Sequence, residues 1–307
     1  MNRRDFLSGA AGMAGLAARR KAHHAAPGAR APQYYDTARL LHAGISSSSF
    51  NNFFARTRAA ASRLPGPMMP LLDFPGIISD RYQVHHLEFN SLHFATTEPE
   101  YLAQLRREIH RARSRLVNID AHAPEEGGGL SDRDPAARNA AVAIVKQWID
   151  VAHATGAASV STSPGSVNTA DLNPTLDSYR ALADYGRRRR VNVLIENGED
   201  TAPGEIIDVL RQAGERTLAA LPNFSKFASP SARIAGLELL FSRVITLCHA
   251  NGVSFDNQGN ETTFDFQQCI EIAKRYRFSG IYSVEFDGPG DPYQGVQNVI
   301  NELMRFL

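Results

Sequence analysis

The feature that most constrains this chain is an alternation, repeated eight times, between short apolar runs and longer segments with helical spacing. The runs have the length of strands and lie at residues 42–46, 84–89, 115–121, 157–162, 191–196, 218–223, 244–249 and 280–286. The helical spacing is clearest near the end of the chain, where Val296, Val299 and Leu303 fall on one face. Eight strands, each followed by a helix, predict a single (β/α)8 TIM barrel of the α/β class.

A doubly wound open sheet is the competing arrangement for such an alternation. Sheets of that kind commonly carry a glycine-rich phosphate loop after the first strand, and no such loop follows residues 42–46. The prolines between residues 65 and 75 predict an irregular first crossover rather than a regular helix. The sequence Asp134-Pro135 is typical of a helix start and predicts that the helix around Trp148 begins there.

The first 31 residues do not belong to the predicted barrel. Residues 2–7 read NRRDFL, and an apolar, glycine-rich run, a basic cluster and a small-x-small cleavage site at 29–31 follow. This order resembles a twin-arginine (Tat) export signal. The resemblance implies recognition by the Tat export machinery and a periplasmic or otherwise exported protein. We therefore expect a signal peptide at 1–31 and the barrel at 32–307.

Removing that leader changes the charge of the chain. Residues 32–307 contain 27 basic and 31 acidic side chains, a net charge of −4. Nucleic-acid binding calls for a basic surface, so we expect no nucleic-acid partner. The predicted mature chain has no uncharged apolar stretch of membrane-spanning length, which predicts no membrane span. The sequence leaves the oligomeric state open.

The chain has two cysteines, Cys248 and Cys269, too few for a disulfide scaffold or a cysteine-based zinc module. Each lies next to apolar positions, and we expect both to be core residues. A disulfide between them stays open, because sequence alone does not establish the geometry.

Four predicted strands end in a side chain that can coordinate a cation. These residues are Glu196, Asn223, His249 and Glu285. The carboxyl ends of parallel barrel strands meet at one rim, where charged groups are costly to bury unless they are paired or bind a metal. Salt bridges to helices and a hydrogen-bonded core histidine are the structural alternatives. Histidine with oxygen donors suits one divalent ion such as Mn²⁺, Co²⁺, Mg²⁺ or Zn²⁺.

The segments at 191–197, 218–227, 248–262 and 282–296 resemble the xylose isomerase-like TIM-barrel superfamily, and more narrowly its sugar phosphate isomerase/epimerase branch. In that family Glu, Asp, His and Glu on strands five to eight hold one divalent metal ion. The resemblance places these ligands at Glu196, Asn223, His249 and Glu285. Asn223 departs from the pattern, because an amide brings no charge, and we expect weaker metal affinity.

Other polar residues near the predicted rim are candidates for contacts with substrate: Glu88, His122, Lys226 and Asn251. On the third strand Asn118, Asp120 and His122 alternate with Val117, Ile119 and Ala121, which predicts one polar face toward the barrel interior. Ketose 3-epimerases of the superfamily carry a Glu and an Arg where this chain has Ala202 and Phe255. The resemblance therefore does not imply a free-ketose epimerase.

The resemblance implies proton transfer next to a carbonyl, with Glu285 removing a proton and Glu196 delivering one through a metal-stabilised enediolate. The first hypothesis is a metal-dependent isomerase or epimerase of a small, sugar-like substrate. The second is a lyase, dehydratase or hydratase that acts on a keto-sugar or a 3-keto-glycoside. The third is a catalytically silent, carbohydrate-binding barrel, which Asn223 keeps open.

Overall fold

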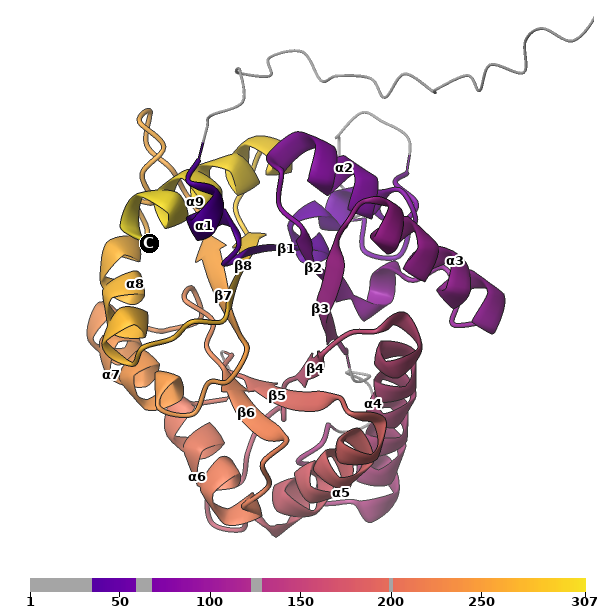
Figure 1. The fold of residues 1–307 in the computed structure, drawn as a ribbon. Helices are drawn as coiled ribbons and strands as arrows, with labels where there is room; N and C mark the ends of the chain where they lie inside the picture. The colour runs from indigo at the N-terminus through magenta and orange to yellow at the C-terminus, as the bar shows by residue number, and fades with distance from the viewer. Residues whose placement is uncertain (1–34, 59–67, 123–128, 199–200) are drawn as a thin grey trace, which may run out of the picture. The chain divides into compact units, whose positions relative to one another are not determined.

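The computed structural model describes residues 35–58, 68–122, 129–198 and 201–307, and the segment from Tyr35 to Leu307 forms one compact unit. The expected export signal at 1–31 lies outside the described residues. The strands form an eight-stranded sheet of parallel pairs in the order β6-β5-β4-β3-β2-β1-β8-β7. Figure 1 shows the strands curled into a ring with helices outside it, so the predicted (β/α)8 barrel is confirmed.

The strands lie close to the predicted runs, at β1 Ala43–Ser46, β2 His86–Asn90, β3 Arg115–Asp120, β4 Ser159–Thr162, β5 Asn192–Glu196, β6 Leu218–Leu221, β7 Leu247–Gly252 and β8 Ile281–Phe286. The seventh strand begins three residues later than predicted and continues beyond His249. Between β6 and β7 the sheet closes through single bridges, with His249 N donating to Pro222 O at 2.8 Å. His249 therefore lies within the strand, between its neighbours after β6 and on β8, and not at the end of the strand.

The α-helices are α1 Thr37–Leu40, α2 Phe74–Tyr82, α3 Pro99–Arg111, α4 Pro135–Thr155, α5 Asn173–Arg189, α6 Pro203–Ala213, α7 Pro230–Phe241, α8 Phe266–Arg275 and α9 Pro292–Phe306. Two 3-10 helices, η1 Ser47–Phe53 and η2 Ser91–His93, follow β1 and β2. The irregular first crossover is confirmed for its described residues before Phe74, where η1 and turns stand, but the crossover then continues as the regular helix α2, which the prediction did not include. The predicted start of α4 is also confirmed, because Asp134 caps it and accepts hydrogen bonds from Ala136 N and Ala137 N.

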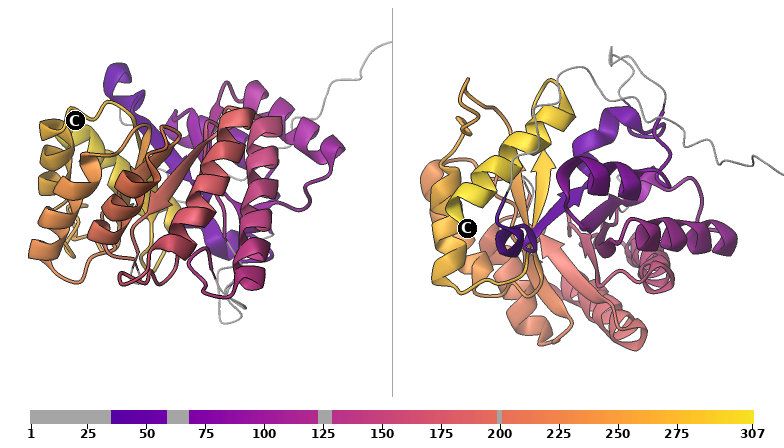
Figure 2. Two further views of the ribbon diagram at one scale, coloured as in Figure 1. Left: turned by 90° about the horizontal axis from the view of Figure 1, so that it is seen from below. Right: turned by 45° about the horizontal axis from the view of Figure 1, so that its top comes forward.

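The apolar core has two parts. The larger part lies between the sheet and the helices, and it contains the outward-facing strand residues Val193, Ile195 and Cys248. A second, small cluster, the inner cluster, consists of Leu194, Ala219, Leu221 and Leu247 on β5, β6 and β7, with Val117 and Ile281 packed against it. The two views in Figure 2 show the helical layer around the strands from the side and obliquely. The inner cluster closes one end of the barrel, so polar side chains gather at the other end.

The register of β3 differs from the simple alternation predicted for it. Leu87 pairs with Leu116, but Glu88 pairs with Asn118, so Val117 is an extra residue on β3. Val117 consequently packs against the inner cluster instead of facing the helices, and this part of the prediction is wrong. Asn118 and Asp120 face the interior as predicted, as their contacts with Ser161 on β4 show.

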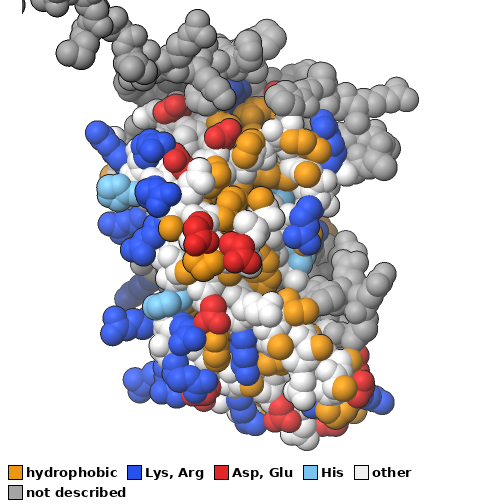
Figure 3. Space-filling model, turned by 90° about the vertical axis from the view of Figure 1, so that its right-hand side faces the viewer, with side chains coloured by type: hydrophobic (Ala, Val, Ile, Leu, Met, Phe, Trp, Pro, Cys, Tyr) orange, Lys and Arg blue, Asp and Glu red, His pale blue; other side chains and the backbone are white. Residues whose placement is uncertain are grey.

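The surface away from the site carries many basic side chains. The last turn of α5 contains Arg187, Arg188 and Arg189, and α3 and α8 also end in basic residues. Figure 3 shows Lys and Arg side chains gathered along one edge of the molecule. Cations at helix carboxyl ends interact favourably with the helix dipole, which explains this distribution. Within the described residues, no helix is long and apolar enough to span a membrane.

Both cysteines are buried and free in the described structure. Cys248 lies on β7 and faces the helices, while Cys269 lies on α8 in the same apolar core. Burial raises the pKa of the Cys248 thiol well above its usual value, and the pKa of Cys269 to about 12. Both therefore behave as core residues, as expected from the sequence.

Candidate functional site

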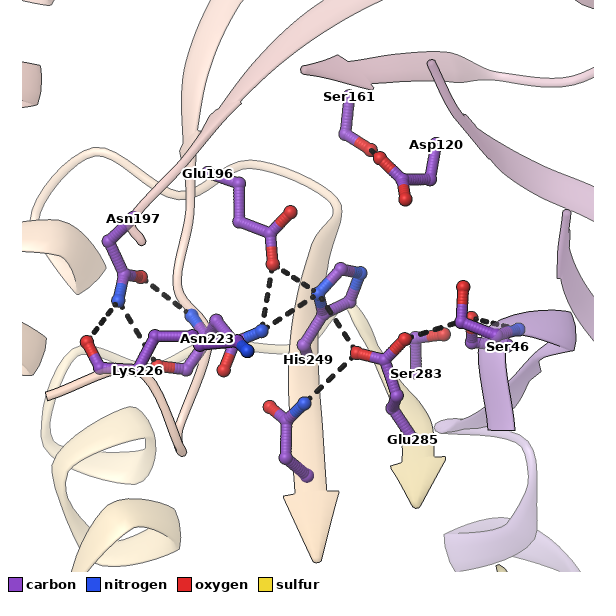
Figure 4. A network of polar contacts seen from close by, with 12 residues as sticks. Ser46, Asp120, Ser161, Glu196, Asn197, Asn223, Lys226, His249, Ser283 and Glu285 are labelled. Atoms are coloured by element: carbon purple, nitrogen blue, oxygen red, sulfur yellow. Dashed lines mark hydrogen bonds and ion pairs between the residues drawn. The ribbon is translucent and has the colours of Figure 1, made fainter. Parts of the chain in front are cut away.

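The site is centred on the imidazole ring of His249, which the inward side of β7 carries into the polar half of the barrel. The ring is 2% exposed. Its Nδ1 atom lies 2.9 Å from Glu196 Oε1 on β5 and 3.7 Å from Glu285 Oε2 on β8. Figure 4 shows both carboxylates and the Asn223 amide arranged around this nitrogen. The structure thus brings together the four side chains that the sequence selected.

Asn223 is oriented differently from a metal ligand. Its Nδ2 donates to Glu196 Oε1 at 2.7 Å, and its Oδ1 accepts hydrogen bonds from Ser225 N and Ser225 Oγ, both at 3.0 Å. The amide therefore presents its donor, not its oxygen, to the other three residues. In this orientation Asn223 holds the Glu196 carboxylate, and its amide oxygen faces Ser225.

Glu88 occupies the opposite side of the His249 ring. Both of its carboxylate oxygens lie near Nε2, at 3.0 and 3.1 Å, and its side chain is fully buried. Asn118 and Ser283 also donate hydrogen bonds to this carboxylate. The sequence suggested Glu88 as a substrate contact. In the described structure these neighbours cover the carboxylate completely.

Asn251 is likewise buried rather than open to a substrate. Its Nδ2 donates to Glu285 Oε2 at 2.9 Å and to Asp287 Oδ2 at 3.0 Å, while its Oδ1 accepts from Phe224 N. Asn251 thus holds Glu285 in place, and both polar atoms of its side chain are engaged by the protein. Burial, followed by the charge of Asp287, raises the pKa of Glu285 well above its usual value.

The other two expected substrate contacts, His122 and Lys226, are exposed. His122 Nε2 lies 3.1 Å from Asp120 Oδ2 and 3.1 Å from Asn90 Nδ2, so the ring stands over the ends of β2 and β3. The Asp120 carboxylate raises the pKa of His122 to about 9. Lys226 follows β6, and its carbonyl oxygen accepts a hydrogen bond from Asn197 Nδ2. Both side chains are thus available at the barrel mouth.

The central imidazole lies in a strongly acidic environment. Burial alone would lower the pKa of His249, but the carboxylates of Glu88 and Glu196 outweigh burial and raise it well above its usual value. In the part of the chain that the structure describes, no group of three or more His, Cys, Asp or Glu side chains has the arrangement of a metal site. The acidic groups around His249 instead make hydrogen bonds to the ring and to neighbouring amides.

Two residues of the site were missed in the sequence. Asn197 accepts a hydrogen bond from Asn223 N at 2.8 Å and donates to Asn223 O at 3.3 Å, so it fixes the backbone that carries Asn223. Asp287 shares Asn251 with Glu285. A signal existed for each, because Asn197 directly follows Glu196 and Asp287 stands two residues after Glu285.

Comparisons with solved structures show the same fold. A xylose isomerase domain protein from Planctomyces limnophilus has a TM-score of 0.64 at 12% identity, covering 86% of this chain and 96% of that one. D-allulose 3-epimerase from Methylomonas sp. has a TM-score of 0.64 at 11% identity, with coverage of 87% and 98%. A xylose isomerase-like TIM barrel protein from Mycobacterium smegmatis in complex with magnesium has a TM-score of 0.62 at 13% identity, with coverage of 89% and 98%.

At these identities the structural likeness establishes the fold alone. A search of curated protein sequences finds no match. The model of one protein family, the xylose isomerase-like TIM barrel, matches residues 82–307. This range covers most of the barrel and includes the strands β2 to β8, which supply the site. The chain therefore belongs to the xylose isomerase-like TIM barrel family.

Proposed function

We propose that this protein is an exported, metal-dependent isomerase or epimerase that acts on a sugar-like substrate. The observation that carries the proposal is that two glutamates, Glu196 and Glu285, both lie close to the Nδ1 atom of His249. All three residues stand toward the carboxyl ends of the barrel strands. Active sites of TIM barrels lie at this end. Two carboxylates within reach of one substrate suit a reaction that removes a proton and returns one.

The distances around His249 support a cation site. Its Nδ1 faces Glu196 Oε1 at 2.9 Å. A nitrogen lone pair and a carboxylate oxygen remain this close only with a proton or another cation between them. Neighbouring ligands of one divalent ion are about 3 Å apart, given metal–ligand distances of about 2.1 Å. Glu196, His249 and Glu285 do not stand in the arrangement of a metal site, so they would hold such an ion after their side chains turned toward it, and Asn223 would join them if its amide turned over.

A bound divalent ion would supply Lewis-acid polarisation of the substrate carbonyl. The donor set of one imidazole and hard oxygens is compatible with Mn²⁺, Co²⁺, Mg²⁺ or Zn²⁺. The residues of the chain would then move the proton. Glu285, whose pKa burial raises, is suited to accept a proton from the carbon next to the carbonyl, and Glu196 is suited to return one. Asn251 and Asn223 hold these two carboxylates by hydrogen bonds.

The substrate class follows from the groups at the mouth. His122 and Lys226 are exposed polar side chains that can bind hydroxyl or carbonyl oxygens of a small carbohydrate-like molecule. Ala202 and Phe255 stand where ketose 3-epimerases have charged residues, so a free ketose is disfavoured. Export through the Tat machinery, if the leader acts as its sequence suggests, would also keep the enzyme away from sugar phosphates.

One observation favours a lyase as the second candidate. His122 is paired with Asp120, which raises its pKa to about 9, so the ring is protonated at neutral pH. An exposed imidazolium at the barrel mouth can protonate a leaving group. In a keto-sugar or 3-keto-glycoside, Glu285 would remove the proton from the carbon next to the carbonyl. A leaving group on the following carbon would then depart with the proton from His122, which completes an elimination.

The decisive experiment is the metal content of the protein comprising residues 32–307, measured by elemental analysis after incubation with Mn²⁺ or Co²⁺. We expect about one divalent ion per chain, and its loss in the double variant Glu196→Ala/Glu285→Ala. Sugars and keto-glycosides are then screened with the loaded protein. Absence of metal in the wild type would contradict the proposal and favour a silent carbohydrate-binding barrel.

A further inference from the structure

The buried carboxylate of Glu88 has no access to substrate, yet it contacts the central histidine. We infer that Glu88 is a positioning residue that fixes the tautomer and orientation of His249, so that Nδ1 faces Glu196 and Glu285 as a lone pair. This inference rests on the proposed function, because a lone pair at that position serves metal binding. It adds a residue from β2 to a site otherwise built from β5 to β8.

The contacts of Glu88 leave one role for the histidine nitrogen. Asn118 Nδ2 donates to Glu88 Oε1 at 2.6 Å, Ser283 Oγ donates to Oε2, and His249 Nε2 lies 3.0 and 3.1 Å from the two oxygens. An ionised carboxylate only accepts hydrogen bonds. The Nε2 atom must therefore carry a hydrogen, so when a cation replaces the proton between Nδ1 and Glu196 Oε1, Nδ1 is the nitrogen that offers its lone pair.

A second set of contacts keeps the amide of Asn118 from turning. Ser159 Oγ donates to Asn118 Oδ1 at 2.8 Å, and Asn118 Nδ2 donates to Ser161 Oγ at 2.8 Å as well as to Glu88. The extra residue in β3 brings Asn118 opposite Glu88 in the first place. A hydrogen-bonded chain thus crosses the barrel from β4 through β3 and β2 to β7, and all its side chains are fully or almost fully buried.

This arrangement has a known energetic consequence for metal sites. A carboxylate on the second nitrogen of a ligating histidine fixes the ring and raises the basicity of the first nitrogen. Loss of such a partner weakens metal affinity by about 10- to 100-fold. The polar layer around Glu88 therefore has a function beyond stability, since an apolar layer of the same volume would fill the barrel at least as well.

The test compares Mn²⁺ affinity by titration calorimetry in the wild type, Glu88→Gln and Ser178→Ala. The amide in Glu88→Gln keeps the size of the side chain but offers a donor as well as an acceptor, so it no longer enforces one tautomer. We expect affinity to fall about 10- to 100-fold. Ser178→Ala also removes buried hydrogen bonds, to Leu130 O and Pro174 O, but it contacts no member of the chain that runs from Ser159 to His249, and its Mn²⁺ affinity should equal that of the wild type.

A spectroscopic readout separates tautomer control from general loosening. In protein labelled with ¹⁵N-histidine and loaded with Zn²⁺, the wild-type His249 signals should show a protonated Nε2, and Glu88→Gln should change that pattern. If Glu88→Gln does not fold, Ser283→Ala replaces it in the test, because this change removes one hydrogen bond from Glu88. Its Mn²⁺ affinity should fall several-fold. Wild-type Mn²⁺ affinity in Glu88→Gln overturns this inference alone. Absence of Mn²⁺ binding in the wild type overturns the proposed function, and this inference with it.

Discussion

Replacing Asn223 by aspartate should destabilise the metal-free protein and make its stability depend on a divalent ion. The amide Nδ2 of Asn223 donates to Glu196 Oε1 at 2.7 Å, so an aspartate oxygen in its place meets another carboxylate oxygen. No donor remains between the two groups. A cation between them would convert this repulsion into attraction.

The size of the effect follows from the distance. Two unit charges about 3 Å apart repel by about 5–6 kcal/mol at an effective dielectric constant of about 20. The pair can relieve this repulsion by protonating one carboxyl group, which at pH 7 costs about 4 kcal/mol for an ordinary carboxyl. The metal-free Asn223→Asp variant should therefore lose up to about 4 kcal/mol of unfolding free energy. For a domain of this size that lowers the Tm by roughly 8–16 °C.

The assay is thermal unfolding followed by circular dichroism, in EDTA and in excess Mn²⁺. Asn118→Asp is the matched control, because Asn118 Nδ2 donates to the buried Glu88 at 2.6 Å, on the other side of the His249 ring. Both variants should lose stability in EDTA, but Mn²⁺ should restore only Asn223→Asp, whose Mn²⁺ affinity should exceed that of the wild type at least tenfold. A variant Asn223→Asp as stable as wild type in EDTA, or rescue of both variants, would refute the reasoning.

Three further predictions concern other parts of the chain. Glu196→Gln and Glu285→Gln should each lower turnover by at least 100-fold with little change in Tm, and wild-type rates in either would show that the residue is structural. The His122–Asp120 pair should stabilise the fold below about pH 6.5 and lose this effect as pH rises through about 9, because the folded pKa of His122 is raised. Between about pH 6.5 and 9, the unfolding free energy measured in urea should fall less in His122→Gln than in the wild type. An equal fall in both proteins would contradict the pairing. Mass spectrometry of the periplasmic fraction should find a chain beginning near Pro32, whereas an intact amino terminus there would contradict the cleavage.

Sequence patterns were sufficient for the barrel and for the centre of the site. An apolar strand run is a local feature of the chain, and the parallel arrangement brings the residues at the ends of such runs to one rim. For this reason Glu196, His249 and Glu285 could be selected before the structure was known. The structure confirms that they lie together, at 2.9 and 3.7 Å from one nitrogen.

The role of each polar residue could not be predicted from sequence patterns. Asn251 and Glu88 look like substrate contacts because they stand near strand ends, yet both are buried and bind other side chains. Burial of a side chain depends on neighbours from distant strands, and these neighbours are not adjacent in the sequence. The orientation of the Asn223 amide likewise depends on Ser225 and Glu196 together.

Sequence by itself determined the class of fold, the order of its strands and which side chains reach the polar end of the barrel, because these depend on local periodicity. Tertiary structure decided the register of β3 and the later start of β7, which depend on hydrogen bonds between strands. The extra residue Val117 places Asn118 opposite Glu88, whose carboxylate contacts His249. A shift of one residue in a strand changes which side chains meet across the barrel, and only the assembled sheet specifies that shift.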